Sequence, residues 1–206
     1  MAPQQPYHIV VAHFNEDLEW LTPFDKETLI IYSKGTLATV DCIQKVLPNV
    51  GRESHTYLSY ILEYYDNLPN IVFFTQGSIR EHMYFDQKDY IQQKFLLMQA
   101  NSSDNYTVEH FNYGLDPDWH LAFCREFLAR SPLSGKDFFK TYINPDIDLD
   151  SPIRWYGGAI FSVKREAILS RSKEYYKTLL DTVSENNAPE TGHFLERSWY
   201  YIFNNN

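Results

Sequence analysis

The stretch Ile71-Val72-Phe73-Phe74-Thr75-Gln76-Gly77-Ser78 decides the fold, because a continuous apolar run passes directly into a polar turn. Such a run predicts a strand that is buried on both faces, as in a parallel sheet. Two similar runs precede it, at residues 9–12 and 28–32, and apolar residues at helical spacing occupy residues 54–67. This order of strand, strand, helix and strand predicts a doubly wound α/β sheet.

The second half of the chain continues the pattern. Apolar residues at helical spacing predict helices at residues 86–99, 119–130 and 176–183, and a last helix from about Gly192. Residues 155–163 form an apolar run that contains two glycines, so we expect a glycine-bearing strand there, followed by a helix that opens at Lys164. No internal repeat or linker interrupts the sequence. Residues 1–206 are therefore expected to form one α/β domain, a mostly parallel sheet flanked by helices.

Composition narrows the class of protein. The formal net charge of −9 argues against a broad nucleic-acid-binding surface, which needs clustered Lys and Arg side chains. The apolar run at residues 9–12 is too short for a signal peptide or a membrane span. Two cysteines make neither a disulfide framework nor a zinc site. We therefore expect a soluble protein of a reducing, cytoplasmic compartment.

Polar side chains follow each of the three predicted strands, where ligands bind in open α/β sheets. They are His13 and Asn15 after the first strand, Lys34 after the second, and Thr75-Gln76-Gly77 after the third. A loop at residues 49–53 should reach the same edge, so that Lys34 and Arg52 could together face a pyrophosphate. Each residue also has a plainer interpretation on its own. Asn15 could cap a helix, Lys34 could be a solvated turn residue, and Arg52 could form a surface ion pair.

Several known motifs are absent from the sequence. There is no Gly-x-Gly-x-x-Gly fingerprint and no Gly-x-x-x-x-Gly-Lys-Ser/Thr loop, which argues against a fingerprinted dinucleotide site and a P-loop. The missing fingerprint also weakens the case for a dehydrogenase-type enzyme that modifies nucleotide-sugars. No Gly-x-Ser-x-Gly elbow is present either, so a serine hydrolase of that architecture is not expected.

Six blocks of the sequence, spread over residues 7–203, resemble a known family. They are residues 10–17, 51–58, 64–69, 72–77, 156–166 and 192–199. Together they resemble an uncharacterised glycosyltransferase-like family of fungal, bacterial and large-virus proteins, a domain of unknown function similar to A-type glycosyltransferases. The resemblance implies an A-type, Rossmann-like fold, with the host cytoplasm as the compartment if the protein is viral. It also implies a nucleotide-sugar donor, of UDP type, and transfer of the sugar to a hydroxyl group of a glycan acceptor.

The resemblance further implies roles for individual residues. The donor would be bound by His13, Asn15, Lys34, Arg52, Thr75, Gln76, Gly77, Arg80, Gly157, Gly158 and Arg197. Arg52 is the first choice for the diphosphate, because the guanidinium fork matches phosphate geometry, and Arg80 and His82 come next. Inverting A-type enzymes often carry an acidic residue several positions before an arginine on a late helix. Glu190 has that place relative to Arg197 and is the first choice as general base, with His193 and Glu196 as alternatives.

One departure from the A-type pattern concerns metal binding. A-type transferases usually carry Asp-x-Asp after the third strand to hold Mn²⁺ or Mg²⁺, but this chain has Thr75-Gln76-Gly77 there. Asp146, Asp148 and Asp150 lie instead in a polar loop at residues 144–151, where they are either solvated or a displaced metal site. No metal ligand is assigned, and Mn²⁺ or Mg²⁺ stays an open alternative. The missing acids also motivate a second hypothesis, an inactive transferase fold that binds glycans or proteins.

Overall fold

In the computed structural model of the protein, residues 7–78, 107–110, 115–116, 118–121 and 128–204 are described. A five-stranded sheet has the order β3-β2-β1-β4-β7 and is made of β1 Tyr7–His13, β2 Leu29–Ser33, β3 Ile43–Val46, β4 Ile71–Gln76 and β7 Phe161–Lys164. Strands β1 to β4 are parallel, and β7 joins β4 in the antiparallel direction. The mixed α/β class, the mostly parallel sheet and the central place of β1 are thereby confirmed.

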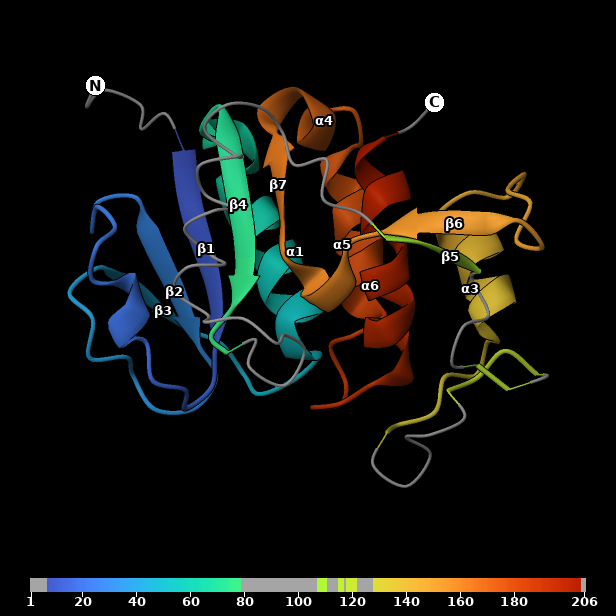
Figure 1. Ribbon diagram of the computed structural model, residues 1–206, viewed down its shortest axis with the longest axis horizontal. Helices are drawn as coiled ribbons and strands as arrows, with labels where there is room; N and C mark the ends of the chain where they lie inside the picture. Colours follow the sequence, from blue (N-terminus) through green and yellow to red (C-terminus); the bar gives the residue numbers. More distant parts are fainter. Residues whose placement is uncertain (1–6, 79–106, 111–114, 117, 122–127, 205–206) are drawn as a thin grey trace.

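Helices α1 Arg52–Tyr64, α5 Lys173–Asp181 and α6 Glu190–Phe203 pack against the sheet (Figure 1), and successive residues of β1 point to its opposite faces. Val10 joins the larger apolar core, which also holds side chains of these three helices. Ile9 and Val11 face the other side, where Leu18 and Leu21 cover them beside a 3₁₀ helix at Glu19–Leu21. The sheet is therefore covered on both faces, as its continuous apolar strands require.

The strands that follow β1 in the chain pair with it on both of its sides, and this strand order sets where a ligand can bind. It runs outward from β1 to β2 and β3, then returns through α1 to β4, which pairs with β1 on the other side. The order of the strands thus reverses between β1 and β4. In open α/β sheets ligands bind beyond the carboxyl ends of the strands at this reversal.

Helix α3 Gly135–Tyr142 and the two-stranded antiparallel sheet of β5 Thr107–His110 and β6 Pro152–Trp155 lie to the side of this sheet (Figure 1). A short helix α4 Arg165–Leu169 follows β7 directly, and two 3₁₀ helices at Tyr65–Asn67 and Gly157–Ala159 precede β4 and β7. The expected opening of a helix at Lys164 is confirmed by α4, as are the helices predicted around residues 176–183 and 192–203.

Two predictions about secondary structure are wrong for the described residues. Residues 155–163 are not one strand, because Gly158 and Ala159 have φ values of 68° and 53° and break the run between β6 and β7. The helix expected at residues 119–130 does not form at its described ends. There Trp119 has φ 62°, and Leu121 and Ala129 form isolated bridges with Leu115 and Pro189. The helix predicted at residues 86–99 lies outside the described residues.

Candidate functional site

A cavity of about 360 Å³ opens at the carboxyl ends of β1 and β4. The described residues that line it include His13, Lys34, Arg52, Glu53, Gln76 and Asn187. They come from the ends of β1, β2 and β4, from the start of α1, and from the segment before α6. The two cations expected at this edge are therefore brought to one cavity, at the reversal of strand order.

The loop after β1 is held by its own polar side chains. His13 is buried, with Nδ1 3.1 Å from Ser33 Oγ and Nε2 3.2 Å from the carbonyl oxygen of Glu16. Asn15 Oδ1 accepts hydrogen bonds from the backbone N–H and the hydroxyl of Thr36, at 3.0 and 2.9 Å. His13 therefore lines the cavity, whereas Asn15 ties the loop after β1 to the loop after β2.

Lys34 and the first turn of α1 form one wall of the cavity. The Lys34 ammonium donates hydrogen bonds to the carbonyl oxygens of Val50 and Arg52. Burial lowers the pKa of Lys34 to about 8, although the charge of Glu53 acts in the opposite direction. Arg52 is exposed and has φ 45°, directly after Gly51 with φ 60°.

Gly51 fixes the direction in which this turn enters α1. A Cβ atom at position 51 would lie 2.3 Å from the carbonyl oxygen of Val183, so no other residue fits there without movement of the backbone. The Gly51 N–H also donates to the carbonyl oxygen of Asn186 at 2.7 Å. The segment before α6 thereby holds the turn that presents Arg52.

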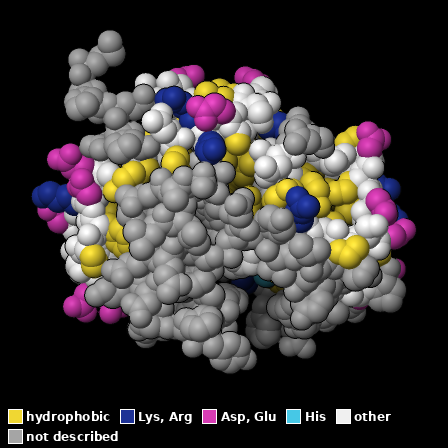
Figure 2. Space-filling model, turned by 45° about the horizontal axis from the view of Figure 1, so that its top comes forward, with side chains coloured by type: hydrophobic (Ala, Val, Ile, Leu, Met, Phe, Trp, Pro, Cys, Tyr) yellow, Lys and Arg dark blue, Asp and Glu magenta, His cyan; other side chains and the backbone are white. Residues whose placement is uncertain are grey.

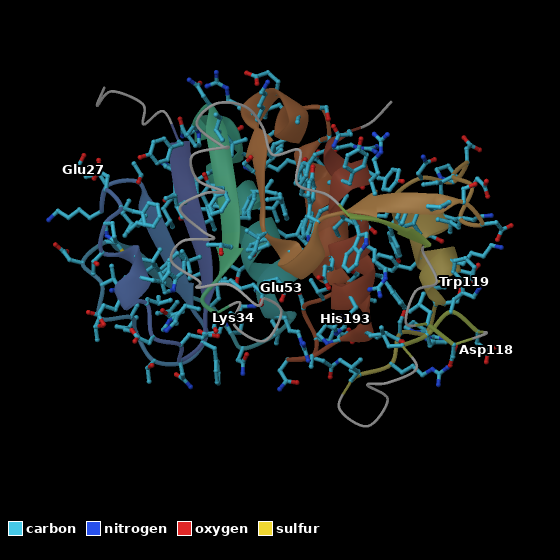
Figure 3. All side chains as sticks on the ribbon, in the orientation of Figure 1. Glu27, Lys34, Glu53, Asp118, Trp119 and His193 are labelled. Carbon is cyan, nitrogen blue, oxygen red and sulfur yellow. The ribbon has the colours of Figure 1, made fainter. Side chains whose placement is uncertain are left out.

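A group of three titratable side chains, Glu53, His193 and Glu196, comes together beside the cavity from α1 and α6. Figure 3 shows Glu53 and His193 at the same end of the molecule as Lys34. Burial, and then the negative charge of Glu196, raise the pKa of Glu53. Glu196 Oε1 accepts a hydrogen bond from the Gly158 N–H at 3.1 Å, and its Oε2 lies 3.8 Å from His193 Nδ1.

Two features of this group bear on chemistry. The Nε2 atom of His193 is buried and has no hydrogen-bond partner among the described residues. Glu53 was not singled out from the sequence, where it reads as a surface partner of Arg52. The sequence signal that points to the cavity is its place in the loop at residues 49–53, which was expected to reach this edge; in the structure Glu53 lies in the first turn of α1.

The turn Thr75-Gln76-Gly77 does reach the cavity, and Gln76 is the residue that lines it. Its Nε2 donates to the carbonyl oxygen of Gly158 at 2.6 Å. Thr75 is buried, and its hydroxyl donates to the Gln76 carbonyl oxygen at 3.1 Å. Gly77 packs closely, since a Cβ atom there would lie 2.8 Å from Glu16 Oε2. Gly157 and Gly158 begin the 3₁₀ turn that Gln76 contacts.

Glu190 and Arg197 have other surroundings, and neither belongs to the described residues that line the cavity. Glu190 is buried at the start of α6 and accepts hydrogen bonds from the N–H groups of Leu121 and Ser131, at 2.7 and 2.9 Å. Its Oε2 also lies 2.8 Å from His120 Nδ1. Arg197 is buried too, donates to the His193 carbonyl oxygen at 3.0 Å and stacks over Trp155. Arg80 and His82 lie outside the described residues.

The acidic loop lies beyond α3, at the side of the molecule away from β1 (Figure 1). Asp148 accepts hydrogen bonds from the Asp150 N–H at 3.0 Å and from the Ser151 hydroxyl at 2.6 Å, and these bonds lower its pKa. Among the described residues, no group of three or more His, Cys, Asp or Glu side chains is arranged to hold a metal ion. Asp148 therefore stabilises its own loop.

The described residues on one face of the molecule do not form a concentrated basic region. On the face shown in Figure 2, the described Lys and Arg side chains are scattered and stand apart from one another. Over the described part of the chain, no helix combines the length and the apolar character needed to cross a membrane.

Comparison with known proteins gives one match. Neither a curated protein sequence nor a solved structure matches the chain. Residues 9–206 match the family described as a protein of unknown function, DUF3431, and this match covers the sheet, the cavity and α6. The chain therefore belongs to the DUF3431 family.

Proposed function

We propose that the protein is a glycosyltransferase of A-type fold, which transfers a sugar from a nucleotide-sugar, of UDP type, to a hydroxyl group of a glycan acceptor. One observation carries the proposal. A single cavity at the reversal of strand order has Lys34 and Arg52 on its wall and Glu53 beside them, with His193 and Glu196 in electrostatic reach. Cations for a diphosphate and carboxylates for a proton are the two requirements of this reaction.

Arg52 is suited to the leaving diphosphate. Its guanidinium group is exposed on the cavity wall, and arginine pairs with phosphate oxygens through two parallel hydrogen bonds. Lys34 adds a second charge while two of its N–H groups hold the turn that carries Arg52. As the bond between the sugar C1 and the diphosphate oxygen breaks, negative charge grows on that oxygen, and both cations stabilise it.

The carboxylates of Glu53 and Glu196 are suited to the proton of the acceptor. Burial and the charge of Glu196 raise the pKa of Glu53, so the ionised form of Glu53 is disfavoured, while Glu196 is kept in place by the Gly158 N–H. In the reaction the acceptor oxygen forms its bond to C1 and its proton passes to Glu196, assisted by the nearby His193. Glu190, whose carboxylate is engaged by backbone N–H groups, is assigned a structural role instead.

The end of β4 does not offer the carboxylate oxygens that suit a divalent metal ion. Hard cations take carboxylate oxygens. The end of β4 offers an amide, Gln76, which is already bonded to Gly158, and Glu16 Oε2 accepts a hydrogen bond from the Phe14 N–H at 2.7 Å. No step of the proposed reaction is therefore assigned to a metal.

Donor binding is tested by thermal unfolding with UDP and UDP-sugars. A ligand at 100 times its Kd adds about 2.7 kcal/mol to the stability, which for a domain of this size raises Tm by roughly 5–11 °C. Arg52→Ala should remove most of the shift, whereas the control Arg154→Ala, which removes the contact between Arg154 and Tyr200, should keep it. The proposal fails if no nucleoside diphosphate or nucleotide-sugar shifts Tm at millimolar concentration.

A second function is favoured by the absence of carboxylates from residues 75–77, namely a transferase fold that has lost activity and binds a glycan or a protein. Catalytic turnover distinguishes the two functions, because only the transferase consumes the donor. Release of UDP from a UDP-sugar in the presence of acceptor supports the transferase, whereas oligosaccharide binding without hydrolysis or transfer supports the binding module.

A further inference from the structure

The turn Gly157–Ala159 has an unusual backbone for a segment beside a cavity. Gly158 and Ala159 both lie in the left-handed region, with φ values of 68° and 53°. Glycine adopts this conformation readily, but for alanine it is strained. Strain of this kind persists only where surrounding groups hold the backbone in place, and it gathers at functional sites.

Three side chains from three different elements hold this turn. Gln76 at the end of β4 donates to the Gly158 carbonyl oxygen at 2.6 Å, and Glu196 on α6 accepts from the Gly158 N–H at 3.1 Å. The buried hydroxyl of Tyr57 on α1 donates to the Ala159 carbonyl oxygen at 3.0 Å. The N–H and the carbonyl group of Gly158 are thus both hydrogen-bonded to side chains, and one of these, Gln76, lines the cavity.

The chemistry of the bond from Gln76 explains the residue type at this position. A carbonyl oxygen accepts hydrogen bonds, so its partner must carry a hydrogen. The amide of glutamine supplies one, whereas an ionised carboxylate would bring two acceptors together and repel the carbonyl oxygen. An acid at position 76 is therefore incompatible with this contact, although A-type enzymes usually have acids at the end of this strand.

We propose that Gln76 is a positioning residue, which with Glu196 holds the Gly157–Ala159 turn next to the cavity in which the donor would bind. This inference rests on the proposed transferase function. The side chain that stands in the usual place of a metal ligand would then serve to fix the backbone. Gln76→Glu would release the turn and would not create a metal site.

The experiment compares the wild-type protein with Gln76→Glu, Gln76→Ala and a matched control, Gln44→Glu. Gln44 also donates through Nε2 to backbone carbonyl oxygens, those of Ala38 and Val40 at 2.9 and 3.1 Å, but it lies on edge strand β3. Hydrogen exchange of residues 157–160 is measured on each protein by mass spectrometry. Transfer from a UDP-sugar is measured with and without Mn²⁺, and the Tm shift with UDP verifies folding and donor binding.

We expect both Gln76 variants to exchange residues 157–160 roughly tenfold faster and to lose about 10²-fold in kcat, since small misplacements at a reacting centre are costly. The Tm shift with UDP should be smaller for Gln76→Glu than for Gln76→Ala, because a carboxylate adds negative charge to the wall of the cavity that would hold the diphosphate. Gln44→Glu should behave as the wild type in all three measurements. Unchanged exchange in Gln76→Glu would overturn the inference. Activity of that variant at or above the wild-type level in Mn²⁺ would overturn it as well.

The outcomes separate the inference from the proposed function. If the wild-type protein neither binds UDP nor transfers a sugar, the proposed function fails. The exchange rates of residues 157–160 still decide whether Gln76 holds the turn. If the wild-type protein transfers a sugar and kcat is insensitive to Gln76→Ala, the function stands and the positioning role fails.

Discussion

Glu190 provides the sharpest test of how the acidic residues divide between structure and chemistry. Its side chain is 3% exposed and accepts hydrogen bonds from two backbone N–H groups, those of Leu121 and Ser131, while His120 lies against Oε2. These donors belong to a segment distant in sequence from α6, so the carboxylate joins two parts of the chain. Glu190→Ala would leave both backbone N–H groups without an acceptor.

The size of the effect follows from these bonds. A hydrogen bond to a charged group contributes about 1.5–3 kcal/mol, so two of them give about 3–6 kcal/mol for Glu190→Ala. That is a large part of the 5–15 kcal/mol that stabilises a typical domain. Glu190→Gln keeps one acceptor oxygen and should lose roughly half as much. Urea unfolding, followed through the fluorescence of the buried Trp199, measures both variants.

Glu196→Gln is the matched comparison on the same helix. Its amide oxygen can still accept from the Gly158 N–H, so we expect a loss of about 1 kcal/mol or less in stability and a loss of about 10²-fold or more in kcat. The reverse pattern would refute the reasoning. If Glu190→Gln retained full stability but transferred no sugar, Glu190 would be the general base and the hydrogen-bond geometry would have misled us.

Three further predictions concern ionisation and metal dependence. Because burial and Glu196 raise the pKa of Glu53, the wild-type protein should lose stability relative to Glu53→Gln as the pH rises from 4.5 toward the raised pKa of Glu53. Urea titrations measure the free energy of unfolding of both proteins, and a loss of wild-type stability relative to Glu53→Gln with falling pH would contradict this. Because the pKa of Lys34 is lowered to about 8, UDP affinity measured by calorimetry should weaken as the pH rises through 8, and Lys34→Met should bind at least about tenfold more weakly without that pH dependence. EDTA should leave turnover largely intact, and abolition by the chelator would redirect attention to Asp146, Asp148 and Asp150.

The buried strands of the sheet could be predicted from sequence, whereas the exposed edge strand could not. The strands β1, β2 and β4 are continuous apolar runs, and each was found. Strand β3 was missed because it lies at the edge of the sheet, where Ile43 and Val46 are exposed and no run of buried residues is required. Residues 155–163 were predicted as one strand because positive φ at Ala159 has no sequence signal of its own.

The site was harder to predict than the fold, since its contacts join residues that are far apart in the chain. The topology alone predicted that the strand ends would bring polar groups to one edge of the sheet. It did not predict which of those groups would face the cavity. Glu190 was the first choice in sequence and Glu196 an alternative. In the structure Glu190 is bonded to Leu121 and Ser131, whereas Glu196 lies near the cavity residue Glu53. The raised pKa of Glu53 likewise depends in part on Glu196, a residue that is distant in the chain.

On the proposed function, the proximity of Arg52 and Glu53 in one cavity would link donor binding to proton transfer. Arg52 and Glu53 are consecutive residues at the start of α1, so a diphosphate held by Arg52 would bring negative charge next to Glu53. That charge further disfavours the ionised form of Glu53, whose pKa is already raised by burial and by Glu196. Glu196, which accepts a hydrogen bond from the Gly158 N–H, would then be the carboxylate that accepts the proton of the acceptor hydroxyl. On this argument the bound donor sets the protonation state in which the acceptor hydroxyl can react.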